Sequence, residues 1–377
     1  MKIGFDGKRA VQNNTGLGNY SRYIVDILCR AYPENDYVLF SPKKQRNGRL
    51  EQLLKDFSHL SLVYPSPAFW KLLSSFWRIW GVTSQLETEQ VTIFHGLSNE
   101  LPLNIGKSSA KSVVTIHDLI FLRFPKYYSF IDRKIYAYKF RKACENADKI
   151  IAISECTKRD IQHFYRIPAE KIVVVYQGCD ASFAQPVSDK KKQEVKARYQ
   201  LPEHYILNVG SIEERKNVLS AVQALQQLSS PETHLIIVGR RTPYTEKVEK
   251  FISDNKLGGK VHILSNVPFK DLGALYQMAD IFVYPSRFEG FGIPIIEALN
   301  SGVPVVAATG SCLEEAGGPD SLYVHPDDIN SMAKAFHTLL SDEKKREYVI
   351  EKGKEYASRF SEVKQADQLA EIYRSIL

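Results

Sequence analysis

Residues 288–301 read FEGFGIPIIEALNS, and the pattern of this segment and its flanking residues is the clearest indication of the fold. An apolar run at residues 280–285 precedes it, and a second apolar run at residues 303–306 follows it. Between the two runs, a glycine turn leads into a helix that starts near Pro294. Strand, glycine turn, proline-started helix and strand form a βαβ unit, which predicts a parallel sheet.

Two carboxylates, Glu289 and Glu297, bracket the turn Gly290-Phe291-Gly292. Such a turn lies at the carboxyl end of a strand, where open α/β sheets bind ligands. Its glycines allow backbone N–H groups to approach an anion at the helix N-terminus. Glu289 lies on the loop and Glu297 lies inside the helix, so one carboxylate can meet a ligand's reacting end while the other accepts hydrogen bonds from a ribose diol. This arrangement suits a nucleotide-linked sugar.

The same residues resemble the E-x7-E signature of retaining glycosyltransferases of family 4, which have the GT-B fold. The simpler interpretation is that Glu289 and Glu297 are two surface glutamates beside an ordinary turn. The accompanying Phe288, Phe291 and Gly292 favour the resemblance. It implies that Glu289 acts at the donor sugar, that Glu297 binds the ribose, and that Phe291 and Gly292 belong to the donor-binding loop.

Length and composition indicate a two-domain protein without a disulfide framework. The 377 residues exceed the ~250–300 at which one hydrophobic core stops growing. Five scattered cysteines contain no C-x-x-C pair, and no apolar run approaches the ~20 residues of a membrane-spanning helix. The first strand begins at residue 2 without a signal peptide, so we expect a cytoplasmic protein. Residues 1–185 carry 26 Lys and Arg against 17 Asp and Glu, and the remaining residues carry 24 against 26.

Strand and helix patterns alternate along both halves, which predicts two Rossmann-like α/β domains facing a cleft. We place an acceptor-binding domain at residues 1–185 and a nucleotide-sugar-binding domain at residues 186–357. The polar, lysine-rich residues 177–192 are predicted to be the linker. The family resemblance adds the expectation that the last helix, within residues 358–377, crosses back to the first domain.

Two further glycine-containing segments follow predicted strands. Gly16 and Gly18 open the first helix, where they allow a diphosphate to approach or simply form a turn. In the second half, Gly210 is followed by Arg215 and Lys216, which supply a planar fork of donors and a compact charge for a diphosphate leaving group. An adjacent Arg-Lys pair is commonly only a solvated surface feature. The segments resemble the first glycine loop and the G-x-x-x-x-R/K-K-N segment of the family.

Two histidines end predicted strands of the first half. A histidine at a strand end is most often structural, and we interpret His95 in this way. His117 occupies a position at which family 4 enzymes contact the donor sugar. The resemblance therefore implies a catalytic role for His117.

Two aromatic stretches lie in the basic half of the chain. A helix over residues 69–80 would have one apolar face, and Lys71 and Arg78 would lie away from it. The apolar face consists of Phe69, Leu72, Leu73, Phe76, Trp77 and Trp80. Such a stripe usually packs in a core, although Trp beside Lys or Arg also suits the rim of a membrane interface. Residues 121–140 mix tyrosines with Lys and Arg, which can bind carbohydrate or phospholipid or form a helix pair.

We therefore expect a hexosyltransferase that transfers mannose from GDP-mannose, or else a hexose from a UDP-sugar, to a glycan or polyprenyl-linked acceptor of cell-surface polysaccharide. A peripheral contact with anionic membrane is part of this expectation. We expect no metal, because the cations here are side chains and no Asp-x-Asp motif is present, and no other cofactor. A nicotinamide-dependent dehydrogenase fits poorly, because Ser21 occupies the third glycine position of G-x-G-x-x-G. A nucleic-acid-binding protein is disfavoured by the lack of a recognition module, so no nucleic acid partner is expected.

Overall fold

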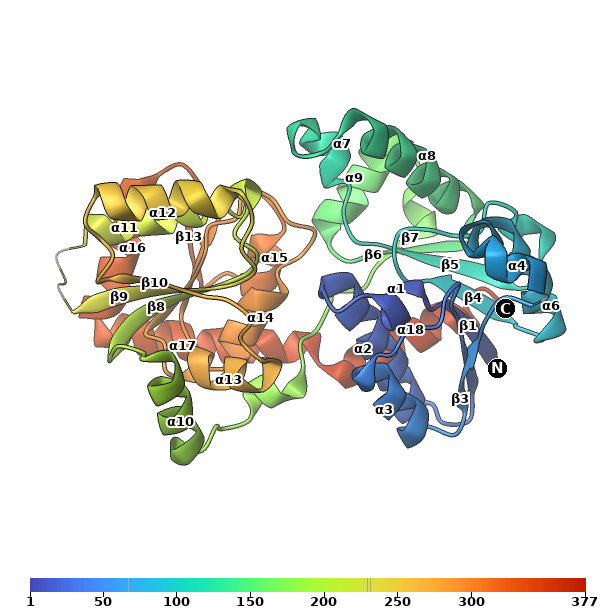
Figure 1. The fold of residues 1–377 in the computed structure, drawn as a ribbon, viewed down its shortest axis with the longest axis horizontal. Coiled ribbons are helices and arrows are strands. Elements are labelled where there is room, and N and C mark those ends of the chain that lie inside the picture. Colours follow the sequence, from blue (N-terminus) through green and yellow to red (C-terminus); the bar gives the residue numbers. More distant parts are fainter. Residues whose placement is uncertain (67, 229, 231) are drawn as a thin grey trace. The chain divides into compact units, whose positions relative to one another are not determined.

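The computed structural model describes residues 1–66, 68–228, 230 and 232–377, which form two compact units. Unit 1 comprises Met1–Tyr176 together with Glu362–Leu377, and unit 2 comprises Gln177–Ser361. Each unit contains one parallel sheet with helices on both faces (Figure 1). The prediction of two Rossmann-like α/β domains is confirmed.

The sheet of unit 1 has seven strands in the order β3-β2-β1-β4-β5-β6-β7, and every neighbouring pair is parallel. Strands in such a sheet are buried on both faces and therefore read as continuous apolar runs. The strands are β1 (Lys2–Asp6), β2 (Asp36–Phe40), β3 (Leu60–Val63), β4 (Ile93–Gly96), β5 (Lys111–Ile116), β6 (Lys149–Ala152) and β7 (Ile172–Val174).

Two hydrophobic cores lie on the two faces of this sheet. One core packs against α1 (Lys8–Gln12), α2 (Gly16–Ala31), α3 (Gly48–Asp56) and α18 (Glu362–Arg374). The other packs against α4 (Ala68–Leu72), the π-helical turn η1 (Trp77–Gly81), α6 (Val82–Thr88), α7 (Ile120–Arg123), α8 (Phe130–Asn146) and α9 (Glu155–Tyr165). The short helix α5 (Ser74–Phe76) connects α4 to η1. The last helix, α18, packs beside α2, and Tyr32 donates a hydrogen bond to Asp367 at 2.7 Å. The expectation that this helix crosses back to the first domain is confirmed.

The sheet of unit 2 has six parallel strands in the order β10-β9-β8-β11-β12-β13. They are β8 (His204–Val209), β9 (Thr233–Val238), β10 (Val261–Leu264), β11 (Ile281–Tyr284), β12 (Val305–Ala308) and β13 (Leu322–Val324). The helices are α10 (Asp189–Tyr199), α11 (Val218–Gln226), α12 (Tyr244–Asp254), α13 (Phe269–Gln277), α14 (Ile293–Asn300), α15 (Leu313–Gly317), α16 (Ile329–Ser341) and α17 (Glu343–Ala357). β8 and β11 are central neighbours, so the loops that follow them lie at the same edge of the sheet.

The linker predicted at residues 177–192 is wrong, because this segment is folded into unit 2. A 3-10 turn buries Phe183 against Phe269 and Tyr276. Helix α10 then begins at Asp189, and its Lys191 and Arg198 bind the buried Asp271 of α13 at 2.6 Å and 2.5 Å. Ion pairs rather than an apolar face hold this helix, so its composition resembles that of a linker. The division therefore falls after Tyr176 rather than after residue 185, and unit 2 extends to Ser361 rather than to residue 357.

Candidate functional site

The loops that follow β8 and β11 place three charged side chains together. Gly210 begins the first loop with φ of +156°, and a Cβ there would lie 3.2 Å from the Lys216 side chain. Asn217 ends the loop in the left-handed conformation, and its amide donates hydrogen bonds to the carbonyls of Pro285 and Pro326. The backbone N–H of Arg287 also donates to the Arg215 carbonyl at 2.9 Å. The two loops are thus fastened together.

Glu289 accepts hydrogen bonds from two cations and two hydroxyls. Its Oε2 lies 2.7 Å from Arg215 Nη1, and its Oε1 lies 2.9 Å from Lys216 Nζ. Ser286 and Tyr284 donate to Oε1 at 2.8 Å and 3.2 Å. The side chains of Glu289, Arg215 and Lys216 are only 13%, 15% and 18% exposed. The structure therefore brings together these three of the predicted catalytic residues.

Electrostatics keep this cluster ionised. Burial alone would raise the pKa of Glu289, but Lys216 and Arg215 outweigh it and lower the pKa to about 2. Burial alone would lower the pKa of Lys216, but Glu289 and the neighbouring Tyr284 raise it. Two cations and one buried carboxylate thus lie together at the carboxyl end of the sheet, and Glu213, 3.9 Å from Arg215, is 36% exposed and screened by water. An anion such as a diphosphate suits this place.

Glu297 has a different environment. It lies on α14, and its Oε2 accepts a hydrogen bond from the buried Tyr276 hydroxyl at 2.8 Å. Burial raises the pKa of Glu297 to about 7, against a lowering by this hydrogen bond, and the charge of Asp180 adds to the increase. A group that titrates near neutrality can bind a diol as a carboxylate and lose that ability when protonated.

The glycine turn lies directly before α14. Gly292 is the residue that precedes the helix, and Phe291 is buried against Phe360. Cys312, from the loop after β12, donates through its thiol to the carbonyls of Glu289 and Phe291 at 3.0 Å and 2.9 Å. A Cβ on Gly292 would lie 3.0 Å from the Ala316 Cβ. The backbone of the predicted donor-binding loop is therefore held by the neighbouring loop after β12.

Three predicted site residues lie in unit 1. His117 follows β5 and is buried, its Nε2 donates to the Leu97 carbonyl at 2.9 Å, and burial lowers its pKa to about 4. The imidazole is therefore neutral near pH 7. Gly16 and Gly18 open α2, and a Cβ on Gly18 would lie 1.9 Å from the Asn13 carbonyl oxygen. Close packing is thus a sufficient reason for Gly18, and a donor contact of either glycine stays a prediction.

His95 has the environment of a structural residue. Its two ring nitrogens lie 2.7 Å from the Tyr373 hydroxyl of α18 and 2.8 Å from the Thr115 hydroxyl, and the side chain is fully buried. Burial lowers the pKa of His95 to about 3, so the ring is neutral. His95 therefore connects the last helix to the sheet.

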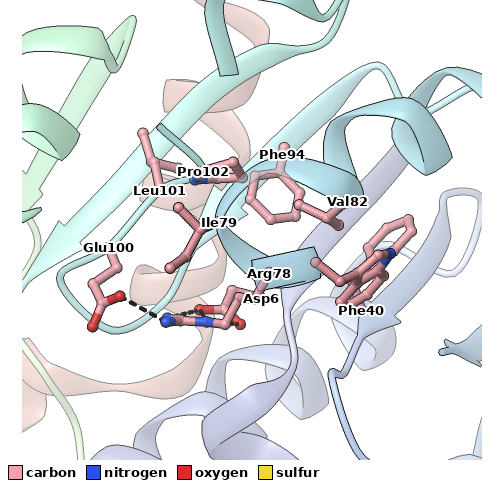
Figure 2. A pocket seen from close by; sticks show the side chains of 10 residues that line it. Asp6, Phe40, Arg78, Ile79, Val82, Phe94, Glu100, Leu101 and Pro102 are labelled. Atoms are coloured by element: carbon pink, nitrogen blue, oxygen red, sulfur yellow. Dashed lines mark hydrogen bonds and ion pairs between the residues drawn. The ribbon is translucent and has the colours of Figure 1, made fainter. Parts of the chain in front are cut away.

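A second ionic cluster lies in unit 1 beside a small pocket (Figure 2). Arg78 donates to both oxygens of Asp6 and, at 2.6 Å, to Glu100, while Lys139 of α8 lies 3.4 Å from the same Glu100 oxygen. The side chains of Asp6, Arg78 and Glu100 are at most 16% exposed. Arg78, predicted to lie away from the apolar face of residues 69–80, is thus engaged in ion pairs inside the unit.

The interpretation of residues 69–80 as core is largely wrong. Only Trp77 of the predicted stripe is buried, whereas Leu72 is 87% exposed and four further side chains are exposed, namely Phe69, Leu73, Phe76 and Trp80. Helix α8 also exposes Phe130, Ile131, Ile135 and Tyr138. Nine of the fourteen exposed large apolar side chains in the described part of the chain lie in these two segments. Both segments cover the same face of the sheet.

Sequence reasoning missed Tyr284, Ser286 and Tyr276. Tyr284 ends β11 and Ser286 follows it, so polar residues at a strand end beside the motif were an available signal. Tyr276 lies on another helix, and the sequence carries no local signal for its contact with Glu297. Among residues 1–66, 68–228, 230 and 232–377, no group of three or more His, Cys, Asp or Glu has the arrangement of a metal site. Over the same residues, no helix combines the length and apolarity that crossing a bilayer requires.

Comparison with known proteins gives two family matches. The model described as Glycosyl transferases group 1 matches residues 189–356, and that described as Glycosyltransferase Family 4 matches residues 21–183. The chain is 29% identical to O-antigen chain mannosyltransferase B of Escherichia coli over 96% of both chains. It is 32% identical to O-antigen chain mannosyltransferase RfbU of Salmonella typhimurium over 60% of both.

Solved glycosyltransferases share the fold. A glycosyltransferase from Rickettsia africae has a TM-score of 0.79 at 21% identity and covers 100% of this chain and 98% of its own. Anabaena HepE in complex with UDP-glucose also has a TM-score of 0.79, at 19% identity with full coverage of both chains. Since the two family models match both units, the dehydrogenase and nucleic-acid-binding alternatives are dropped. The chain belongs to glycosyltransferase family 4 and is a hexosyltransferase with the GT-B fold.

Proposed function

We propose that the protein transfers mannose from GDP-mannose, with retention of anomeric configuration, to a glycan or polyprenyl-linked acceptor in cell-surface polysaccharide synthesis. The observation that carries this proposal is the buried cluster of Arg215, Lys216 and Glu289, together with Glu297 on the helix that follows the Glu289 loop. Two relatives with O-antigen mannosyltransferase names support the sugar and the pathway class.

In the proposed reaction the bond between the anomeric carbon and the diphosphate oxygen breaks, and its electron pair stays on the diphosphate. Arg215 and Lys216 neutralise the charge that grows there. The acceptor hydroxyl forms the new bond on the same face of the sugar and gives its proton to the departing phosphate. Glu297 holds the ribose, while Glu289 and His117 act on the donor sugar.

A UDP-sugar is the alternative donor, and the Anabaena protein named with UDP-glucose supports it. A thermal-shift screen with GDP, UDP, ADP and dTDP separates the two, since only the cognate base should raise the melting temperature strongly. GDP-mannose should then support transfer to a polyprenyl-linked glycan. Stabilisation by UDP alone would replace GDP-mannose with a UDP-sugar, and no stabilisation by any nucleotide would contradict the proposal.

We also propose that unit 1 docks on an anionic membrane, where it meets a lipid-linked acceptor. The exposed apolar side chains of residues 69–80 and of α8 lie among basic residues: residues 126–142 contain six Lys and Arg and one acid. Apolar side chains that enter the headgroup region, together with basic charge, favour an anionic surface. Leu72 and Ile131, 87% and 69% exposed, are the strongest candidates for insertion.

Vesicle co-sedimentation tests this docking. Binding should rise with the phosphatidylglycerol content of phosphatidylcholine vesicles and fall with salt. Leu72→Ser combined with Ile131→Ser should lower binding at least tenfold. Val363→Ser is the matched control, because Val363 is 68% exposed but lies on α18, which packs on the opposite face of the sheet. Absence of binding, or equal loss in the control, would favour a soluble acceptor.

A further inference from the structure

Glu289 pairs with Arg215 and Lys216, the two cations that we propose bind the diphosphate. Its two oxygens accept from Arg215 and Lys216 at 2.7 Å and 2.9 Å. The three side chains carry two positive charges and one negative charge in a nearly enclosed place. A diphosphate that binds Arg215 and Lys216 therefore meets a fixed carboxylate within a few ångströms, and the repulsion is strong where water is scarce.

The two forms of the nucleotide differ in how they experience this carboxylate. In the intact donor the terminal phosphate is esterified to the sugar and carries one negative charge. In the nucleoside diphosphate product the same phosphate is free and carries nearly two negative charges at pH 7. The product thus meets Glu289 with more negative charge and brings no sugar.

The intact donor also supplies hydrogen-bond donors that the product lacks. Glu289 Oε1 accepts from the hydroxyls of Ser286 and Tyr284, which shows that this oxygen is placed to receive O–H groups. Sugar hydroxyls have the same chemistry and can take over such bonds. In the donor complex such bonds to the sugar offset part of the repulsion, and in the product complex they are absent.

We propose that Glu289 is a specificity-determining residue that makes the site prefer the intact nucleotide-sugar over the nucleoside diphosphate and so promotes product release. This inference rests on the proposed function, since it assumes that Arg215 and Lys216 bind the diphosphate. In the product-bound state the Glu289 carboxylate repels the free diphosphate, and this role is separate from its contact with the donor sugar during the reaction.

Isothermal titration with GDP and with GDP-mannose, or with the UDP pair if the base screen selects uridine, tests the proposal. The measured quantity is the ratio of the product Kd to the donor Kd. In Glu289→Gln the product should bind about ten- to a hundredfold more tightly and the donor no more tightly, so the ratio falls by that factor. Glu289→Ser removes the same charge with a smaller side chain and serves if the Gln variant does not fold.

Two further variants separate charge from shape. Glu289→Asp keeps the charge, so its ratio should stay near that of the wild type even where turnover falls. Glu213→Gln is the control, because Glu213 also lies near Arg215, at 3.9 Å, but is 36% exposed and screened by water. An unchanged ratio in Glu289→Gln, or an equal fall in Glu289→Asp, overturns the inference. Failure of the wild type to bind any nucleotide would instead overturn the proposed function.

Discussion

Two buried ionic clusters, one in each unit, have different charge balances. In unit 1 one guanidinium, Arg78, lies between the carboxylates of Asp6 and Glu100. In unit 2 one carboxylate, Glu289, lies between two cations. Both clusters follow strands at the carboxyl ends of parallel sheets, so position in the fold alone does not distinguish them.

The balance of buried charge indicates a difference in role, because the other one-acid cluster, Asp271 with Lys191 and Arg198, has cations that are 27% and 47% exposed and serves to hold α10. The Arg78 cluster connects β1 to the helical segment of residues 77–81, and Lys139 of α8 supplies a further cation. Its charges are compensated within the unit, which is the arrangement of a structural tie. The Glu289 cluster sets two nearly buried cations against one buried carboxylate, while the second acid near Arg215, Glu213, is 36% exposed, and this arrangement suits an anion.

The largest expected effect is on catalysis in unit 2. Lys216→Ala should lower turnover about 10²–10³-fold, because the charge that Lys216 neutralises grows as the glycosidic bond breaks. The fold should remain, since Arg215 still pairs with Glu289. Steady-state kinetics with the cognate donor measure the effect, and circular dichroism checks the fold.

The same assay in EDTA examines the role of metal. Wild-type activity and the Lys216→Ala deficit should both persist with chelator, since side chains supply the counter-charge. Activity that is abolished by EDTA and restored by magnesium or manganese would show that a metal is the main counter-charge of the phosphate, and the mechanism would have to be dropped.

The corresponding change in unit 1 should affect stability. Arg78→Met leaves two buried carboxylates without their main partner, which should cost about 3–5 kcal/mol of unfolding free energy. Urea denaturation followed by tryptophan fluorescence suits the measurement, because Trp77 adjoins Arg78. Glu89→Gln breaks the Lys2–Glu89 pair, whose side chains are 32% and 34% exposed, and should cost no more than about 1 kcal/mol. Equal effects of the two changes would mean that the Arg78 cluster is not a structural tie.

The sequence predicted the two sheets and the convergence of Arg215, Lys216 and Glu289 because both depend on local patterns. Apolar runs that alternate with helical periodicity define the strands, and Arg215, Lys216 and Glu289 all lie on the loops that follow such runs. The solvent exposure of individual side chains was not predictable in the same way. The stripe that contains Leu72 and Trp77 has one periodicity whether it faces a core or solvent, and packing alone decides that Trp77 is buried and Leu72 is not. Helix α10 was missed because a buried acid, Asp271, holds it by charge.

Glu297 offers a pH-dependent comparison with Glu289, whose pKa of about 2 keeps it ionised throughout the accessible range. The pKa of Glu297 is raised to about 7, so protons compete with the ribose diol below neutrality. Affinity for the intact donor should therefore rise about tenfold from pH 6 to pH 8. The intact donor is the suitable ligand, because its diphosphate does not titrate in this range.

Glu297→Gln supplies the control for this dependence. It loses a charge-assisted acceptor, so donor affinity at pH 8 should fall about ten- to a hundredfold. The remaining affinity should not vary between pH 6 and pH 8. A pH dependence that survives in Glu297→Gln would assign the titration to another group.

The smallest expected effect concerns the hydroxyl of Tyr276. Tyr276→Phe keeps a fully buried ring and removes the hydrogen bond to Glu297 Oε2. That bond lowers the pKa of Glu297 against burial, so its loss should raise the pKa further and move the rise in donor affinity to higher pH. Titrations from pH 6 to pH 9 should show about a two- to tenfold loss near pH 7 that diminishes toward pH 9. A loss of equal size at every pH would mean that the Tyr276 hydroxyl does not act through the pKa of Glu297. A shift in the pH dependence of donor affinity that vanishes in the double variant with Glu297→Gln would establish that the hydroxyl acts through the charge of Glu297.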